Sequence, residues 1–193
     1  MDREIQGISD ALEIIESLFY LPQPRRLKCE TLFRLARRAT GHIVELGTFH
    51  GNGYIALSLG ADPDQQMVYT IDDYSPKAGW AGESYGPDDK QVFEENCYVA
   101  GIAPLLINKS SDDAVVGWEM PIDLLFWDLG CENMLDRSMG IWESHIQSGG
   151  ILAIHDTYSN LFGAKKYMEG MVANGKYCQY EVMPGGVHVA VKR

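Results

Sequence analysis

Short apolar runs alternate with segments of helical periodicity from Gly41 onward, and this alternation limits the possible folds more than any other feature. The apolar runs cover residues 43–46, 67–71, 105–107, 122–127 and 151–154, and the helical segments that follow them cover 54–59, 87–100, 112–116, 134–146 and 164–173. Strands that alternate with helices form βαβ units, in which parallel strands are covered by helices on both faces. The sequence therefore predicts a doubly wound α/β fold.

The last two apolar segments follow a different pattern. Residues 177–183 and 187–192 are separated only by Pro184, Gly185 and Gly186. A connection this short cannot make a parallel crossover, so the two strands are expected to form an antiparallel hairpin. The full prediction is a seven-stranded sheet, mostly parallel, with an antiparallel hairpin at its C-terminal end.

Two amphipathic helices are expected before the first strand, over residues 7–20 and 27–39. We therefore divide the chain into an N-terminal helical extension, 1–40, and a main domain, 41–193. The extension is expected to cover the substrate side of the main domain or to pair two subunits in a homodimer. The only basic cluster in the sequence lies here, and it forms a solvated face, an interface or a site for an acidic group: Arg25, Arg26, Lys28, Arg34, Arg37 and Arg38.

Composition disfavours several classes of function. Sixteen Lys and Arg residues against 27 Asp and Glu give a net charge of −11, which argues against nucleic-acid binding because that binding depends on basic residues that neutralise phosphates. No apolar stretch approaches the roughly 20 residues of a membrane helix, and no signal for secretion is visible, so we expect a cytoplasmic protein that does not contact a membrane. The four cysteines are scattered, which disfavours a zinc ribbon or a disulfide scaffold.

The first strand leads into a glycine-rich turn, with glycines at 47, 51 and 53. Glycines permit a tight turn and a close approach to a ligand, and their spacing differs from the Gly-x-Gly-x-x-Gly of dinucleotide sites. Glu45, at the end of this strand, can pair with an ammonium group. Asp72 ends the next strand, about 20 residues beyond the turn, where an acid accepts hydrogen bonds from ribose hydroxyls. The pattern indicates a nucleoside that carries an amino acid.

Glu-x-Gly-x-x-x-Gly-x-Gly at 45–53, followed by Asp72, resembles the class I S-adenosylmethionine (SAM)-dependent methyltransferases, which have a Rossmann-like fold. The resemblance extends from about residue 41 to the closing hairpin. It implies that Glu45, Gly47, Thr48, Gly51 and Gly53 surround the methionine part of SAM and that Asp72 holds the ribose. It also implies that the turn at 109–112 flanks the adenine through Ser110 and Ser111.

Acids and a histidine follow two further strands: Asp128 after 122–127, and His155 with Asp156 after 151–154. The arrangement is similar to that of metal-dependent O-methyltransferases of the catechol and macrocin types. It implies that Asp128, His155 and Asp156 bind Mg²⁺ or Mn²⁺, and that the metal lowers the pKa of a small hydroxylated acceptor. The alternative is that both acids cap helices and that the histidine is neutral and hydrogen-bonded.

Three further points stay open at this stage. Related domains continue Asp-Gly-x-His-x-Tyr after the fourth strand, whereas residues 128–133 here lack that histidine and tyrosine. An inactive protein that binds SAM or S-adenosylhomocysteine (SAH) is therefore an alternative, and a nicotinamide-dependent oxidoreductase is a weaker one.

His50 is either a general base or a simple loop histidine. The long aromatic loop at 72–90 is either a lid over the acceptor or a mobile surface loop.

Overall fold

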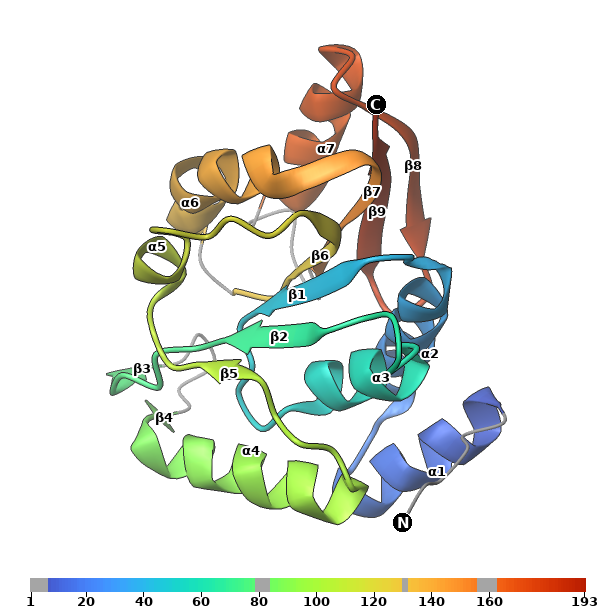
Figure 1. The fold of residues 1–193 in the computed structure, drawn as a ribbon, viewed down its shortest axis with the longest axis vertical. Coiled ribbons are helices and arrows are strands. Elements are labelled where there is room, and N and C mark those ends of the chain that lie inside the picture. The colour runs from blue at the N-terminus through green and yellow to red at the C-terminus, as the bar shows by residue number, and fades with distance from the viewer. Residues whose placement is uncertain (1–6, 79–83, 130–131, 156–162) are drawn as a thin grey trace.

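A computed structural model describes residues 7–78, 84–129, 132–155 and 163–193 (Figure 1). The main sheet has seven strands in the order β5-β2-β1-β6-β7-β9-β8. Their bounds are His42–Leu46 for β1, Val68–Ile71 for β2, Leu106–Ile107 for β5, Ile122–Trp127 for β6, Ile146–His155 for β7, Tyr177–Met183 for β8 and Val187–Lys192 for β9. The first five are mutually parallel, and β9 pairs antiparallel with both β7 and β8. This confirms the predicted fold class.

Helices cover both faces of the sheet (Figure 1). One face carries α1 (Ile8–Leu18), α2 (Gln23–Arg38), α3 (Asn52–Gly60) and α4 (Pro87–Ala100), and the other carries α5 (Ser111–Ala114), α6 (Glu132–His145) and α7 (Ala164–Ala173). Side chains of β6 alternate between the two cores: Leu124 and Phe126 face the first, and Leu125 faces the second. Two short strands, β3 (Lys77–Ala78) and β4 (Ser84–Tyr85), form a separate ribbon. No helix within the described ranges is long and apolar enough to span a bilayer.

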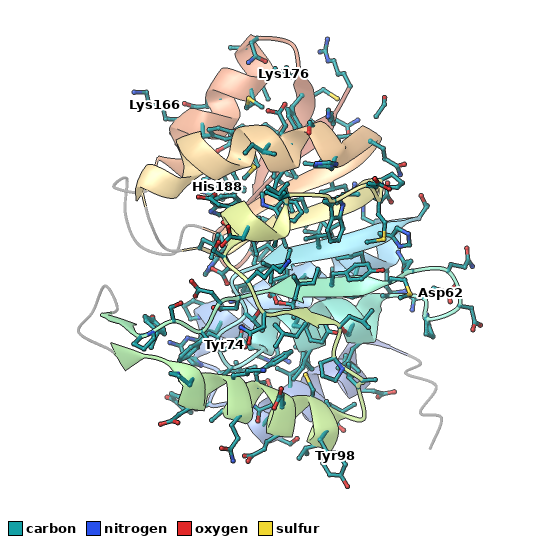
Figure 2. The ribbon with its side chains drawn as sticks, turned by 60° about the vertical axis from the view of Figure 1, so that its left-hand side comes forward. Asp62, Tyr74, Tyr98, Lys166, Lys176 and His188 are labelled. Carbon is teal, nitrogen blue, oxygen red and sulfur yellow. The ribbon has the colours of Figure 1, made fainter. Side chains whose placement is uncertain are left out.

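Strand order reverses at β1, which lies between β2 and β6. The chain runs outward from β1 through β2 to β5, and on the other side from β6 to β7. In open α/β sheets a ligand binds beyond the carboxyl ends of the strands at such a reversal. In Figure 2, Asp62, which precedes β2, and Tyr74, which follows it, lie at opposite ends of the sheet. Tyr74 marks the end at which a ligand is expected.

The helix α2 begins at Gln23, four residues earlier than the sequence pattern predicts. Pro24 falls in its first turn, where proline is tolerated because the N–H it lacks would have no helical partner. The C-terminal part of the chain holds α2 in place. Thr31 Oγ1 donates to the Pro184 carbonyl at 2.8 Å, and Gly185 leaves so little space that a Cβ atom there would lie 2.5 Å from Lys28 Cα. The turn of the C-terminal hairpin therefore packs directly on α2.

Candidate functional site

The glycine-rich loop between β1 and α3 depends on left-handed backbone at two glycines. Gly47 has φ +95° and Gly51 has φ +92°, a region that other residues rarely adopt. A Cβ at Gly47 would lie 2.6 Å from the Asp128 carbonyl oxygen, and a Cβ at Gly51 would lie 2.6 Å from Phe93 Cδ2. Both glycines are thus required by close packing of the loop against β6 and α4, a reason that the sequence pattern alone does not supply.

Asp72, at the end of β2, holds this loop in place. Its Oδ2 accepts hydrogen bonds from the Thr48 N–H at 3.0 Å and the Phe49 N–H at 3.2 Å, and its Oδ1 accepts from the Tyr74 N–H at 3.0 Å. Phe49 has a positive φ of 48°, and its carbonyl accepts from the Tyr74 hydroxyl at 2.8 Å. A carboxylate offers about four acceptor positions, so Asp72 retains capacity for a ligand.

Glu45 is buried beneath the first turn of α3, with an exposed fraction of 1%. Its Oε2 accepts from Thr70 Oγ1 at 2.6 Å, and the Thr70 hydroxyl also contacts that of Thr48. Gly53 packs on the carboxylate so closely that a Cβ there would collide with Oε1. Burial raises the pKa of Glu45 to about 8. A ligand ammonium at this end of β1 would favour the charged form of the carboxyl group.

Asp128, directly after β6, takes part in an ion pair with a lysine and a hydrogen bond with a histidine. Its Oδ2 lies 3.0 Å from the Lys28 ammonium, and its Oδ1 lies 2.7 Å from His155 Nδ1. The side chains of Lys28 and His155 are 7% and 8% exposed, and that of Asp128 is 24% exposed. Burial opposes charge on both Asp128 and Lys28, and the charges and hydrogen bonds around each side chain together outweigh it. The pKa of Lys28 is therefore raised, and Lys28 and His155 together hold the pKa of Asp128 well below its usual range.

The predicted metal site is only partly reproduced. Asp128 and His155 come together, whereas Asp156 lies outside the described residues. Each Asp128 oxygen already has a partner, and one of these partners is an ammonium that would repel a divalent ion. Among the residues that the structure describes, no cluster of three His, Cys, Asp or Glu side chains could hold a metal. The described contacts therefore do not fit a divalent cation.

The side chain of His50 is engaged in contacts with neighbouring side chains. Its Nε2 lies 2.7 Å from Asp89 Oδ1 near the start of α4, and its ring stacks on Phe49 with centroids 3.7 Å apart. The His50 carbonyl accepts from Asn96 Nδ2 at 3.0 Å. These contacts anchor the glycine-rich loop to α4 and favour the loop-histidine interpretation over the general-base interpretation.

Ser110 and Ser111, which are predicted to flank the adenine, lie at the start of α5: Ser110 is its N-cap and Ser111 is its first residue. Ser110 Oγ caps the helix by accepting from the Asp113 N–H at 3.1 Å. Ser111 is fixed through its carbonyl, which accepts from Trp142 Nε1 at 3.1 Å. Its hydroxyl is buried and has no hydrogen-bond partner among the described residues, and the same is true of Trp127 Nε1. The Ser111 hydroxyl and Trp127 Nε1 thus retain unused hydrogen-bonding capacity.

Sequence reasoning missed Lys28 as a site residue because it belongs to a cluster of basic residues. A signal was nevertheless present. Lys28, Leu32 and Leu35 are spaced by four and three residues, which places them on one helix face, and that face is buried. A lysine on the apolar stripe of a helix requires a buried partner of opposite charge.

Comparison with known proteins identifies the class. A family model described as a methyltransferase domain matches residues 44–157, which is more than half of the chain. The chain belongs to this family, and the match confirms the resemblance to class I SAM-dependent methyltransferases.

Solved structures agree in fold. A methyltransferase from Podospora anserina, bound to SAH, has TM-score 0.68 at 16% identity, covering 98% of this chain and 91% of that one. The O-methyltransferase TomG from Streptomyces achromogenes, involved in tomaymycin synthesis and in complex with SAM, has TM-score 0.61 at 16% identity, with 98% and 91% covered. An rRNA methylase from Streptococcus thermophilus has TM-score 0.60 at 13% identity, with 90% and 99% covered. At these identities the likeness concerns the fold and leaves the acceptor open.

Proposed function

We propose that this methyltransferase transfers the methyl group of SAM to a hydroxyl group of a small acceptor molecule. The observation that carries the proposal is the glycine-rich loop at the reversal point of the sheet, held by Asp72 and underlain by the buried Glu45. At one edge of the sheet, this combination places backbone groups of the loop, an acid for the ribose hydroxyls and an acid for the ammonium group. The family match supports methyl transfer.

Each part of the cofactor has a proposed partner. The methionine part lies along Gly47, Thr48, Gly51 and Gly53, with its ammonium toward Glu45. The ribose hydroxyls use the remaining acceptor capacity of Asp72. The adenine lies beside Ser110 and Ser111, where the Ser111 hydroxyl has no partner among the described residues.

The acceptor is proposed to be a small hydroxylated compound. The net charge of −11 opposes binding of a nucleic acid, and O-methyltransferases are among the proteins of the same fold. Asp128 lies next to the loop, because its N–H donates to the Leu46 carbonyl at 2.8 Å, and His155 is hydrogen-bonded to Asp128. The reacting oxygen is expected at these two side chains. A cytoplasmic location and pairing of two subunits stay predictions.

Calorimetric titration with SAH, with NAD as the control ligand, tests the cofactor assignment. We expect saturable binding of SAH and none of NAD. Preference for NAD would overturn the assignment in favour of an oxidoreductase. A screen of phenols, sugars and other alcohols with SAM labelled in its methyl group then tests catalysis.

A second candidate function is binding of SAM or SAH without transfer. It is favoured by the absence, at residues 128–133, of the histidine and tyrosine that related domains carry there. Tight SAH binding together with no labelled product from any class of hydroxylated acceptor would support this second function.

A further inference from the structure

The imidazole of His155 is buried at the carboxyl end of β7 with one nitrogen unused. Its Nδ1 is 2.7 Å from Asp128 Oδ1, and its Nε2 is buried and has no hydrogen-bond partner among the described residues. Leaving a buried polar atom without a partner is energetically unfavourable. The ring is 92% buried, since its exposed fraction is 8%, and Nε2 retains its hydrogen-bonding capacity for a ligand.

The partner on Nδ1 decides what Nε2 can do. An ionised carboxylate can only accept hydrogen bonds, so Nδ1 carries the proton that is shared with Asp128. In the neutral ring, Nε2 then holds the free lone pair. The Lys28 ammonium balances the negative charge of Asp128. The carboxylate can therefore orient the His155 ring while the Lys28–Asp128 pair as a whole carries no net charge.

The position of Lys28 is built into the fold. Its backbone packs closely against Gly185 of the hairpin turn, and the hydroxyl of nearby Thr31 donates a hydrogen bond to the Pro184 carbonyl. At the other end, the Asp128 N–H donates to the Leu46 carbonyl at 2.8 Å, directly before Gly47 of the glycine-rich loop. The row Lys28–Asp128–His155 therefore runs from α2 to the edge at which the methyl donor is proposed to bind.

We propose that the Lys28 ammonium takes the place of a divalent cation beside Asp128, and that His155 Nε2 accepts the proton of the acceptor hydroxyl. This inference rests on the proposed function, and it replaces metal assistance by groups of the chain itself. Asp128 is a positioning residue that holds His155 in one tautomer, and Lys28 is a positioning residue that acts through Asp128.

The proposed step is balanced. The acceptor O–H bond breaks and its proton moves to His155 Nε2, while an oxygen electron pair forms the bond to the methyl carbon. The carbon–sulfur bond of SAM breaks, and its electron pair stays on sulfur, which becomes the neutral thioether of SAH. The proton on His155 leaves to water after the product departs.

Metal dependence is the first test. We expect Mn²⁺, followed by electron paramagnetic resonance, to show no stoichiometric binding to the wild-type protein with or without SAH. Turnover should stay within twofold when EDTA replaces Mg²⁺. Stoichiometric Mn²⁺ binding that Asp128→Asn abolishes, or turnover that EDTA stops and Mg²⁺ restores, would overturn the proposal.

The role of His155 is tested by His155→Gln. We expect turnover to fall by about 100-fold or more, the usual contribution of a general base, with SAH affinity unchanged within twofold. Lys28→Arg, which keeps the cation, should retain more activity than Lys28→Met. The matched control is Lys176→Met, because Lys176 pairs with Glu143 at 3.4 Å on the opposite face of the sheet. Wild-type turnover in His155→Gln would overturn the assignment.

The two proposals fail in different ways. Loss of the proposed function would appear as no SAH binding or no methylated product in the wild type. Failure of the Lys28 proposal would appear as stoichiometric Mn²⁺ binding at Asp128 in a protein that still binds SAH. The Mn²⁺ measurement stays decisive even before an acceptor is found.

Discussion

Lys28 and Asp128 form a buried ion pair at 3.0 Å although they are 100 positions apart in the chain. The pair joins α2 to the end of the central strand β6. Because the ammonium is 7% exposed, it is a structural part of the edge that carries the proposed site. The N-terminal helices thus contribute a charged group to the methyltransferase core.

Replacing this ammonium should destabilise the protein. Lys28→Met leaves the Asp128 carboxylate partly buried with its cation removed, and breaking a buried pair costs about 3–5 kcal/mol. Asp128 is 24% exposed, so we expect a value near the lower end. Urea unfolding measures the loss. The double variant with Asp128→Asn should recover part of it, and a single-variant loss below about 0.5 kcal/mol would contradict a buried pair.

The hairpin turn should be equally sensitive. Gly185 and Gly175 have similar positive φ angles, +84° and +80°, but only Gly185 has neighbours within reach of a Cβ. Alanine in the left-handed region costs about 1–2 kcal/mol at either position, whereas Gly185→Ala also collides with the backbone of α2. Thermal unfolding of the two variants separates the effects. Equal losses of thermal stability in the two variants would mean that the hairpin turn does not pack closely on Lys28.

The alternation of strands and helices was readable from the sequence because each element is long enough to show its own period. The bounds of α4, β6, α7 and both hairpin strands agree with the predicted ranges. The start of α2 was missed because Pro24 looks like a helix terminator, although it also fits a first turn. The start of β7 was missed because Gln147, Ser148, Gly149 and Gly150 precede its apolar run.

The site was predictable in outline and not in its contacts. Glu45, Asp72 and Asp128 were identified because they end strands, and the ends of parallel strands share one edge. What each carboxylate binds depends on tertiary packing: backbone N–H groups for Asp72, a hydroxyl for Glu45, and an ammonium for Asp128. Only the last of these partners lies outside the domain in which the motifs occur.

Weakening the anchor of the glycine-rich loop should weaken cofactor binding. Asp72→Ala removes the acceptor for the Thr48 and Phe49 N–H groups, a loss of about 1–3 kcal/mol, or roughly 5- to 150-fold in the dissociation constant of SAH. Calorimetry measures it. Asp62→Ala is the matched control, because Asp62 accepts from Asp64 and Gln65 at the opposite end of the sheet (Figure 2). Wild-type affinity in Asp72→Ala would refute the assignment.

Glu45 should make the stability of the cofactor-free protein depend on pH. Its folded-state pKa is about 8, against an ordinary value of 4.5. Between these values the folded state keeps a proton that the unfolded state has lost, so the free energy of unfolding falls as pH rises. Glu45→Gln cannot titrate and should lack this slope. Urea unfolding at intervals from pH 5 to 9 compares the two proteins, and parallel curves would show that the carboxyl group is not protonated by burial.

Packing of Gly185 on α2 also has a consequence for synthesis of the chain. Residue 185 leaves the ribosome after the glycine-rich loop, β6 and Lys28. The helix α2, which carries Lys28, therefore lacks its contact with the hairpin turn until the hairpin has been synthesised. Contacts between such distant segments form late, because closing a long loop is entropically costly. A nascent chain that stops before the hairpin would therefore carry every motif of a methyltransferase and still lack a completed site.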